Sequence, residues 1–257
     1  NEAQNASTDD LNAELAPILT QLAYVRQRRG DDATAAQLYE KVLDMDVSDQ
    51  AVVAVCNNNL VALRGREGGA PALSRLANLT KTQVQDKLSN TQKRIIQFNR
   101  CIILLQLGKY DDLQKLVKTL DPASEFTVLI QSATLIKKGQ TNKAIETLRE
   151  FIRSNTREGA SSSASTSAIR AQLSLAQLQM SQGNVKEAIG LLKSITSLQY
   201  EPALLATLVT LHQKIGELGT ALSHLDETAA KLMVNKKAMD VAQVTAILKK
   251  SAELKLA

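Results

Sequence analysis

The chain has 257 residues, a formal net charge of +5 and 44% hydrophobic residues, with only 3% aromatic residues and no Trp. Four prolines leave long stretches free to form helices, and no apolar run approaches the roughly 18 residues that a membrane-spanning helix needs. This composition favours an ordered all-α protein and speaks against a transmembrane helix. Because the sequence begins with Asn1 rather than Met, we interpret it as a piece of a longer protein.

A short phrase recurs along the chain: a Gly, a polar stretch and, in most copies, an Ala five positions after the Gly. Its copies begin at Gly30, Gly65, Gly108, Gly139, Gly183 and Gly216. Repetition at this spacing is typical of stacked helix pairs, in which each Gly lies in the turn between two helices. The sequence therefore predicts about six helix pairs over residues 11–234, after a polar, disordered leader at residues 1–10.

Two intervals between turn glycines are long enough to hold an insertion. We place the first at residues 79–89, where Ser89 is a candidate N-cap for a helix that begins near Thr91. The second is the Ser-rich segment 155–167, which lacks helical periodicity and is predicted to be a mobile loop. After a last paired helix, residues 235–257 are interpreted as the terminal helix of a truncated further repeat.

The tetratricopeptide repeat, a helix pair of about 34 residues, has the length and the small-residue pattern that fit these copies. When each turn Gly is set at repeat position 15, position 20 holds Ala in five of six repeats, Ala70 among them. Helix axes approach to about 8–10 Å where side chains at the contact are small. We therefore predict that six alanines pack at helix crossings: Ala23, Ala35, Ala144, Ala176, Ala188 and Ala221. The predicted fold class is an all-α tetratricopeptide-repeat superhelix, an α-solenoid of about six helix pairs plus a C-terminal helix.

Motifs for catalysis or metal binding are missing from the sequence. The two histidines, His212 and His224, have no second His or Cys at metal-ligand spacing, and no phosphate-binding or nucleophile motif is present. Cys56 and Cys101 lie in apolar helical patterns and are expected to be buried, reduced thiols. We expect a protein that is not an enzyme and that needs no metal, cofactor or small-molecule substrate.

The expected binding surface is a concave face lined by the first helix of each pair. The positions at which some repeats of this kind clamp a C-terminal carboxylate with Lys and Asn hold mostly neutral or apolar residues here. We therefore expect a peptide or helix docked by shape and hydrogen bonds. The candidate groove contacts are Tyr24, Asn59, Phe98 and Gln177, although packing between repeats explains Phe98 equally well.

A second candidate surface is the C-terminal end, where residues 229–257 carry six lysines against two acidic residues. Its candidate basic contacts are Lys249, Lys250 and Lys255. They would bind nucleic acid through phosphate charge rather than base stacking, because the chain has few aromatic residues. A solvated helix face explains the same lysines without any partner.

Five stretches taken together resemble one family. They are ELAPILTQLAYVRQRRGDDATAAQLYEKVL (14–43), KLSNTQKRIIQFNRCIILLQLGKYDD (87–112), LIKKGQTNKAIETLREF (135–151), AQLSLAQLQMSQGNVKEAIGLLKSI (171–195) and PALLATLVTLHQKIGELGTALSHLDE (202–227). Their order, and the insertion before residue 87, resemble the repeat region of the 72-kilodalton subunits of the eukaryotic signal recognition particle. The resemblance covers nearly the whole chain.

This resemblance implies a scaffold subunit of a cytoplasmic ribonucleoprotein, with passage through the nucleus during assembly, that directs ribosomes making secretory proteins to the endoplasmic reticulum. It implies protein partners within the particle, the 68-kilodalton subunit in this family, RNA binding through a basic, Trp-containing segment beyond the repeats, and no membrane insertion. This chain has no Trp, and by the resemblance it corresponds to repeats that follow those expected to dock the 68-kilodalton subunit, so neither contact is assigned to its residues. The alternatives are a generic repeat adaptor in another complex, and an RNA- or ribosome-contacting module that uses the basic C-terminal helix.

Overall fold

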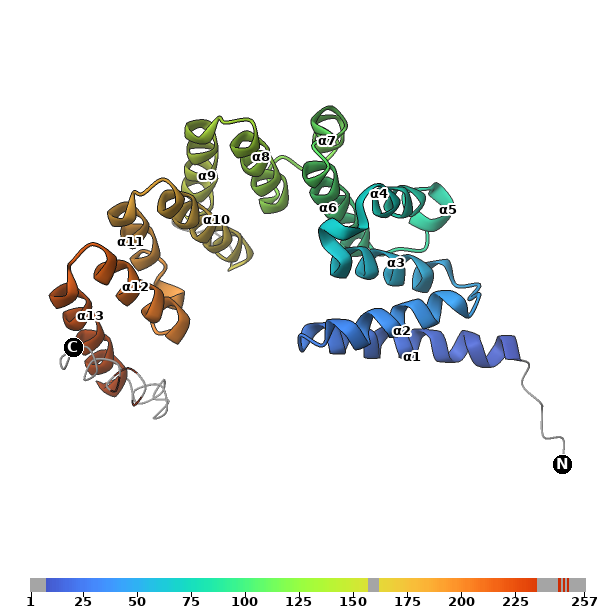
Figure 1. Cartoon of the computed structure of the whole chain (residues 1–257), viewed down its shortest axis with the longest axis horizontal. Helices are drawn as coiled ribbons and strands as arrows, with labels where there is room; N and C mark the ends of the chain where they lie inside the picture. The colour runs from blue at the N-terminus through green and yellow to red at the C-terminus, as the bar shows by residue number, and fades with distance from the viewer. Residues whose placement is uncertain (1–7, 157–161, 235–244, 246, 248, 250–257) are drawn as a thin grey trace. The chain divides into compact units, whose positions relative to one another are not determined.

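The computed structural model describes residues 8–156, 162–234 and residues 245, 247 and 249. Figure 1 shows that the described residues form helices joined by short turns. They contain thirteen α-helices, two short 3-10 helices and no β-strand, which confirms the all-α tetratricopeptide-repeat fold. The chain divides into two compact units, Asn1–Pro122 and Ala123–Ala257.

The described part of the first unit contains three helix pairs. They are α1 (Thr8–Arg28) with α2 (Asp32–Asp44), α3 (Gln50–Arg64) with α4 (Gly69–Asn78), and α6 (Asn90–Gln106) with α7 (Tyr110–Val117). The 3-10 helix Gly65–Gly68 and the short α5 (Thr82–Gln85) interrupt the regular order on either side of α4. Helix α2 packs between α1 and α3, and α3 contacts α4 and α6, so the three pairs form one stack.

The described part of the second unit also contains three pairs. They are α8 (Glu125–Lys137) with α9 (Thr141–Asn155), α10 (Ser162–Ser181) with α11 (Val185–Lys193), and α12 (Pro202–Lys214) with α13 (Leu218–Val234). A short 3-10 helix, Thr196–Leu198, joins α11 to α12. Each helix contacts the next one along the chain, so each pair packs on its sequence neighbours, as in a repeat array (Figure 1).

Glycine turns join the two helices of a pair. In the turn after α10, Gly183 has a φ of +81°, in the left-handed region that L side chains rarely adopt. The Asn184 N–H donates to the Gln179 carbonyl oxygen at 2.9 Å, and the Gly183 N–H donates to the Met180 carbonyl oxygen at 3.1 Å. These two hydrogen bonds satisfy carbonyl groups in the last turn of α10. They require a left-handed residue at the position of Gly183. The recurrent glycines of the sequence therefore have a direct structural reason.

Replacing Gly183 with Ala should destabilise the second unit by about 1 kcal/mol, because a non-glycine residue costs roughly that much in the left-handed region. An added Cβ at Gly183 would meet no atom within 4 Å, so the cost would be conformational rather than steric. The matched control is Gly190→Ala inside α11, which also meets no atom within 4 Å and should stabilise by about 0.5–1 kcal/mol. Urea denaturation measures both changes, and changes of the same sign would contradict this account of the turn.

The six alanines predicted at helix crossings are all buried. Ala221 is 1% exposed and the other five are fully buried. Ala176 of α10 and Ala188 of α11 lie in one apolar cluster with three leucines of α12: Leu204, Leu208 and Leu211. The core of the second unit is therefore a seam that passes from one helix pair to the next.

The second repeat departs from the predicted register. Ala70, which the glycine spacing assigns to a helix crossing, is exposed, whereas Ala72 and Leu76 of α4 are buried. The 3-10 helix Gly65–Gly68 lies between the turn and α4, and it moves the buried face two residues along the chain. The predicted register is therefore wrong for this repeat.

The predicted N-cap at Ser89 is confirmed. The Ser89 Oγ accepts a hydrogen bond from the Gln92 N–H at 3.3 Å, and the Gln92 Oε1 accepts one from the Ser89 N–H at 2.8 Å. These reciprocal bonds form a capping box, which satisfies two N–H groups at the start of α6.

Three segments that the sequence predicts to be irregular are partly helical. Helix α1 begins within the expected leader, α5 lies within the insertion 79–89, and α10 begins at Ser162, within the Ser-rich segment 155–167. The start of α10 is supported by tertiary packing, because Ala168 is 1% exposed and Ile169 packs against the apolar cluster that contains Ala176 and Ala188. Packing of this kind sets helix ends more strongly than local propensity does.

Parts of the predicted organisation lie outside the described residues: 1–7, 157–161 and most of the expected terminal helix, 235–257. Of that helix, Ile247 is described and is buried in a cluster with Leu225 and Leu232 of α13. Within the described residues, no helix is both long enough and apolar enough to cross a membrane.

Candidate functional site

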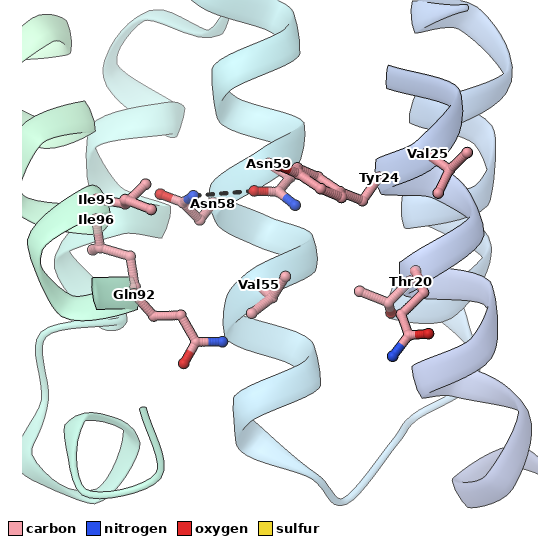
Figure 2. Close-up of a pocket in the computed structure, with 10 residues that line it drawn as sticks. Thr20, Tyr24, Val25, Val55, Asn58, Asn59, Gln92, Ile95 and Ile96 are labelled. Carbon is pink, nitrogen blue, oxygen red and sulfur yellow. Dashed lines mark hydrogen bonds between the residues drawn. The ribbon is translucent and has the colours of Figure 1, made fainter. Parts of the chain in front are cut away.

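A groove of about 540 Å³ lies across α1, α3 and α6 in the first unit, and we call it the first groove. Figure 2 shows side chains from these three neighbouring helices pointing into it. Its lining residues are Thr20, Gln21, Tyr24, Val25, Val55, Asn58, Asn59, Gln92, Ile95 and Ile96.

No residue that lines the first groove is charged, although 22% of the chain is charged. The groove combines aliphatic side chains with amides and hydroxyl groups, and several of its apolar residues are partly open to solvent. Tyr24 and Val25 are each 51% exposed, and Ile95 is 41% exposed. A ligand charge placed here would lose its hydration without gaining a counter-charge, so the groove favours an uncharged ligand.

A chain of hydrogen bonds runs from the groove into the core of the first unit, and we call it the amide relay. Asn99 of α6 donates to the Asn58 Oδ1 at 2.9 Å, and Asn58 donates to the Asn59 Oδ1 at 3.2 Å. Asn59 then donates to the Tyr39 hydroxyl oxygen at 3.0 Å, and that hydroxyl donates to the Gln27 Oε1 at 3.1 Å. The relay joins α6, α3, α2 and α1, and therefore all three helix pairs of the unit.

The amide relay fixes the orientation of the two amides at the groove. Asn58 is 5% exposed and Tyr39 is fully buried, so these bonds lie mostly away from water. Burial raises the pKa of the Tyr39 phenol, which therefore stays protonated and able to donate. Because each bond uses only one hydrogen of an amide, Asn59 keeps a second N–H for a ligand.

A second groove of about 450 Å³ lies in the second unit, between α8 and α10 with α9 beneath them. Its lining residues are Leu129, Ser132, Ala133, Ile136, Leu148, Ser174, Gln177, Leu178 and Ser181, and none of them is charged. Both grooves therefore lie on the first helices of their pairs and have the same neutral character.

The sequence-predicted contacts divide between the two grooves. Tyr24 and Asn59 line the first groove, and Gln177 lines the second. Phe98 lines neither of these two grooves, and its role as a groove contact stays a prediction. Asn99 faces α3 through its bond to Asn58. Ile95 and Ile96 lie three to four residues before Asn99, on the same face of α6, and they line the groove, whereas Phe98 does not.

Sequence reasoning missed two polar residues of the grooves. Asn58 and Ser132 lie seven residues before the turn Gly of their repeats, at the position that holds Ala23 and Ala176 in the first and fifth repeats. Both are buried and both line a groove. The sequence did contain a signal for these two residues, because each is a polar side chain at a position that favours a small apolar one.

The other chemistry-bearing residues that the structure describes line neither groove. Lys249 is exposed, while Lys250 and Lys255 lie outside the described residues. Both cysteines are buried, as predicted, and burial raises the pKa of Cys101 to about 11, so this group stays a thiol at neutral pH. Among the described residues, no three His, Cys, Asp or Glu side chains lie together in a way that could hold a metal ion.

His212 is the buried titratable group of the second unit that has the weakest hydrogen bonding. It is 3% exposed, and among the described residues neither ring nitrogen has a hydrogen bond of good geometry. Its Nδ1 lies 3.4 Å from the Glu217 Oε2, and Glu217 also pairs with Lys186 at 2.9 Å. Burial lowers the pKa of His212, the positive charge of Lys193 lowers it further, and Glu217 opposes both effects.

Lowering the pH from about 7.5 to about 5.5 should therefore destabilise the second unit. Burial also lowers the pKa of His224, so in this range both histidines bind protons more readily in the unfolded chain, where a histidine pKa is about 6.5. The free energy of unfolding is then greatest at pH values above this unfolded-state pKa and decreases as the pH falls below it. His212→Leu should flatten the slope of unfolding free energy against pH in urea denaturation. An unchanged slope in both His212→Leu and His224→Gln variants would contradict this prediction.

Comparison with known proteins gives a consistent result. A family model for the tetratricopeptide repeat matches residues 18–51, which run from α1 through α2 into α3. The human signal recognition particle subunit SRP72 is 30% identical over 224 residues, which are 86% of this chain and 32% of that protein. The dog protein of the same name gives the same identity and coverage. SRP72 of Dictyostelium discoideum is 27% identical over 274 residues, covering 97% of this chain and 39% of that protein.

The chain spans about a third of the length of the curated relatives it matches. The match covers 86% of the chain, which is more than either unit contains. The similarity therefore includes residues of both units rather than a single repeat. The chain is therefore a tetratricopeptide-repeat protein whose sequence, over most of its length, resembles the SRP72 subunits of signal recognition particles.

Proposed function

We propose that this chain is a non-catalytic protein-interaction region of a signal recognition particle subunit. In that role it is cytoplasmic and supports the targeting of ribosomes with nascent chains to the endoplasmic reticulum. The similarity to SRP72 along most of the chain supports the assignment to the particle. The neutral first groove, on a fold that exposes long helix faces, supports protein binding as the activity.

The binding site that we propose is the first groove, and its occupant is a segment of a partner polypeptide. Val25, Val55 and Ile95 offer apolar surface to aliphatic side chains, while the remaining N–H of Asn59 suits a main-chain carbonyl group. The amide relay holds Asn59 in place before the partner arrives, which lowers the entropy lost on binding. A pre-oriented amide beside apolar surface is the observation that carries this proposal.

We place the partner among the protein subunits of the particle. The particle RNA is the weaker candidate for this chain, because phosphate binding requires positive charge and neither groove has any. A generic repeat adaptor in another complex would use the same groove with a different partner.

The test of the assignment is affinity purification of the tagged whole protein from the cytosol of its own cells. We expect signal recognition particle RNA and the other particle subunits to be recovered together with it. Recovery of a stable complex without that RNA would contradict membership of the particle and support the generic adaptor.

The test of the groove uses Tyr24→Arg in the same whole protein. Tyr24 is half exposed at the edge of the first groove, so arginine places a charge there without breaking the amide relay. We expect the partner protein to bind at least about tenfold more weakly, because a buried aromatic contact is lost and a charge is desolvated. Gln37→Arg on the exposed outer face of α2 adds the same charge outside the groove and should leave binding unchanged. Equal affinity for both variants would exclude the first groove as the docking site.

A further inference from the structure

The first helix of the first unit carries an apolar stripe on the side that faces away from the core of that unit. The stripe, which we call the α1 stripe, consists of aliphatic side chains spaced alternately four and three residues apart, each between 40% and 62% exposed: Leu11, Leu15, Ile18, Leu22 and Val25. The other side of α1, with Ala16 and Ala23, is buried in a cluster with residues of α2 and α3 (Figure 1). A continuous exposed stripe of large aliphatic residues along about four helical turns marks an interaction surface.

The second unit shows what kind of element covers such a face. Ala171, Leu175 and Leu178 of α10 lie at the same distances before their turn Gly as the last three residues of the α1 stripe. They are buried in a cluster with Leu148 and Phe151 of α9. On α1 the same face stays exposed among the residues that the structure describes. The α1 stripe therefore fits an amphipathic helix.

The spacing of the α1 stripe is that of a coiled-coil seam. Apolar residues alternately three and four apart form one line along a helix, and two such lines interlock when their helices pair. The last four residues of the stripe are three, four and three apart, a pattern that is the same in both chain directions. Two copies of α1 can therefore pair antiparallel across a two-fold axis. In this arrangement Leu15 of one copy lies opposite Val25 of the other, and Ile18 lies opposite Leu22.

Charges beside the α1 stripe favour the antiparallel orientation. Glu14 and Arg28 are both exposed, and because they lie two heptads apart they border the stripe on the same side, one near each end. Antiparallel pairing brings Glu14 of each copy close to Arg28 of the other, whereas parallel pairing brings like charges together. The helix dipole favours acidic residues at the start and basic residues at the end of any helix, but it does not require both on one border of an apolar stripe.

We propose that a second copy of this chain covers the α1 stripe, so that two α1 helices form an antiparallel pair across a two-fold axis. The pair buries on the order of 1,000 Å² in total, which is near the lower limit for a specific interface. We therefore expect a weak dimer, with a dissociation constant of about 10–100 µM. This self-association goes beyond the proposed function, and of the residues in the stripe only Val25 also lines the first groove.

Sedimentation equilibrium of the intact chain, from about 1 to about 200 µM, measures the self-association. Ile18→Glu places a charge at the most exposed position of the α1 stripe and should weaken the dimer at least about tenfold. Ala13→Glu adds the same charge at an exposed position of α1 outside the stripe and should leave the dimer unchanged. Because both positions are exposed, circular dichroism should show that both variants fold. A chain that stays monomeric at about 200 µM, or equal dimerisation of the two variants, would overturn the proposal and leave the stripe to a helix of another polypeptide segment.

An exchange of charges tests the antiparallel pairing itself. Glu14→Lys and Arg28→Glu should each weaken the homodimer about three- to tenfold, because each variant places like charges together at both ends of the helix pair. In a mixture of the two variants both contacts again join opposite charges, so a heterodimer should form with a dissociation constant within about twofold of that of the unaltered chain. A mixture that associates no more tightly than either variant alone would overturn the proposal. These measurements involve no partner protein, so their failure would leave the proposed function standing.

Discussion

An arginine in place of Ala188 should destabilise the second unit by about 3 kcal/mol, the largest effect that we expect from a single substitution in this chain. Ala188 is fully buried where α11 meets α10 and α12, in a cluster with Ala176 and Leu208. A longer side chain there must push the helices apart or distort its neighbours, and its charge would lose hydration without a partner. The free energy of unfolding from urea denaturation, followed by circular dichroism, measures the loss.

The matched control is Ala206→Arg on α12, where the alanine is exposed. This change adds the same side chain to the same unit and should alter the free energy of unfolding by no more than about 0.5 kcal/mol. Similar losses for the two variants would mean that Ala188 does not mark a helix crossing.

Replacing Asn58 with Leu should destabilise the first unit by about 2 kcal/mol. Leucine has a side chain that branches at the same atom and it prefers helices, but it removes the centre of the amide relay. The Asn99 N–H then loses its acceptor and the Asn59 Oδ1 loses its donor, and each polar group left unpaired in a buried site costs about 1–3 kcal/mol. Partial access of water to Asn59 from the groove keeps the expected total near the lower end of that range.

The control for this prediction is the adjacent residue. Asn57 donates only to the Val53 carbonyl oxygen of its own helix at 2.9 Å, a local bond that adds little to helix stability. Asn57→Leu should therefore change the free energy of unfolding by less than about 1 kcal/mol. If Asn57→Leu were as costly as Asn58→Leu, the loss would reflect helix composition rather than the relay between helix pairs.

Local rules predicted most of the fold, because its repeats are defined by steric needs that single residues reveal. A turn that closes with a left-handed residue needs glycine, and a close helix crossing needs alanine, so both appear in the sequence at fixed spacing. The predicted register was wrong in the second repeat. The 3-10 helix Gly65–Gly68 moved the buried face of α4 from Ala70 to Ala72, and nothing in the spacing from Gly65 indicates that shift.

The candidate site was less predictable, because it depends on how helices from different pairs lie against one another. Counting positions from the turn glycines selects Tyr24 and Asn59, and both line the first groove. The same count selects Phe98 on α6, whereas Ile95 and Ile96 are the residues in the groove. The orientation of α6 is set by its contact with α3 through Asn99, which is 41 residues from Asn58 in sequence.

The measurement that tests the central claim most directly is the salt dependence of peptide binding to the intact chain. If the occupants of these grooves are uncharged polypeptide segments, the dissociation constant should change by less than about twofold between about 50 and about 500 mM KCl. A steep weakening of about tenfold or more would reveal binding by ionic contacts, as in phosphate recognition. That result would contradict neutral grooves as the binding surface and would favour the lysine-rich C-terminal end instead.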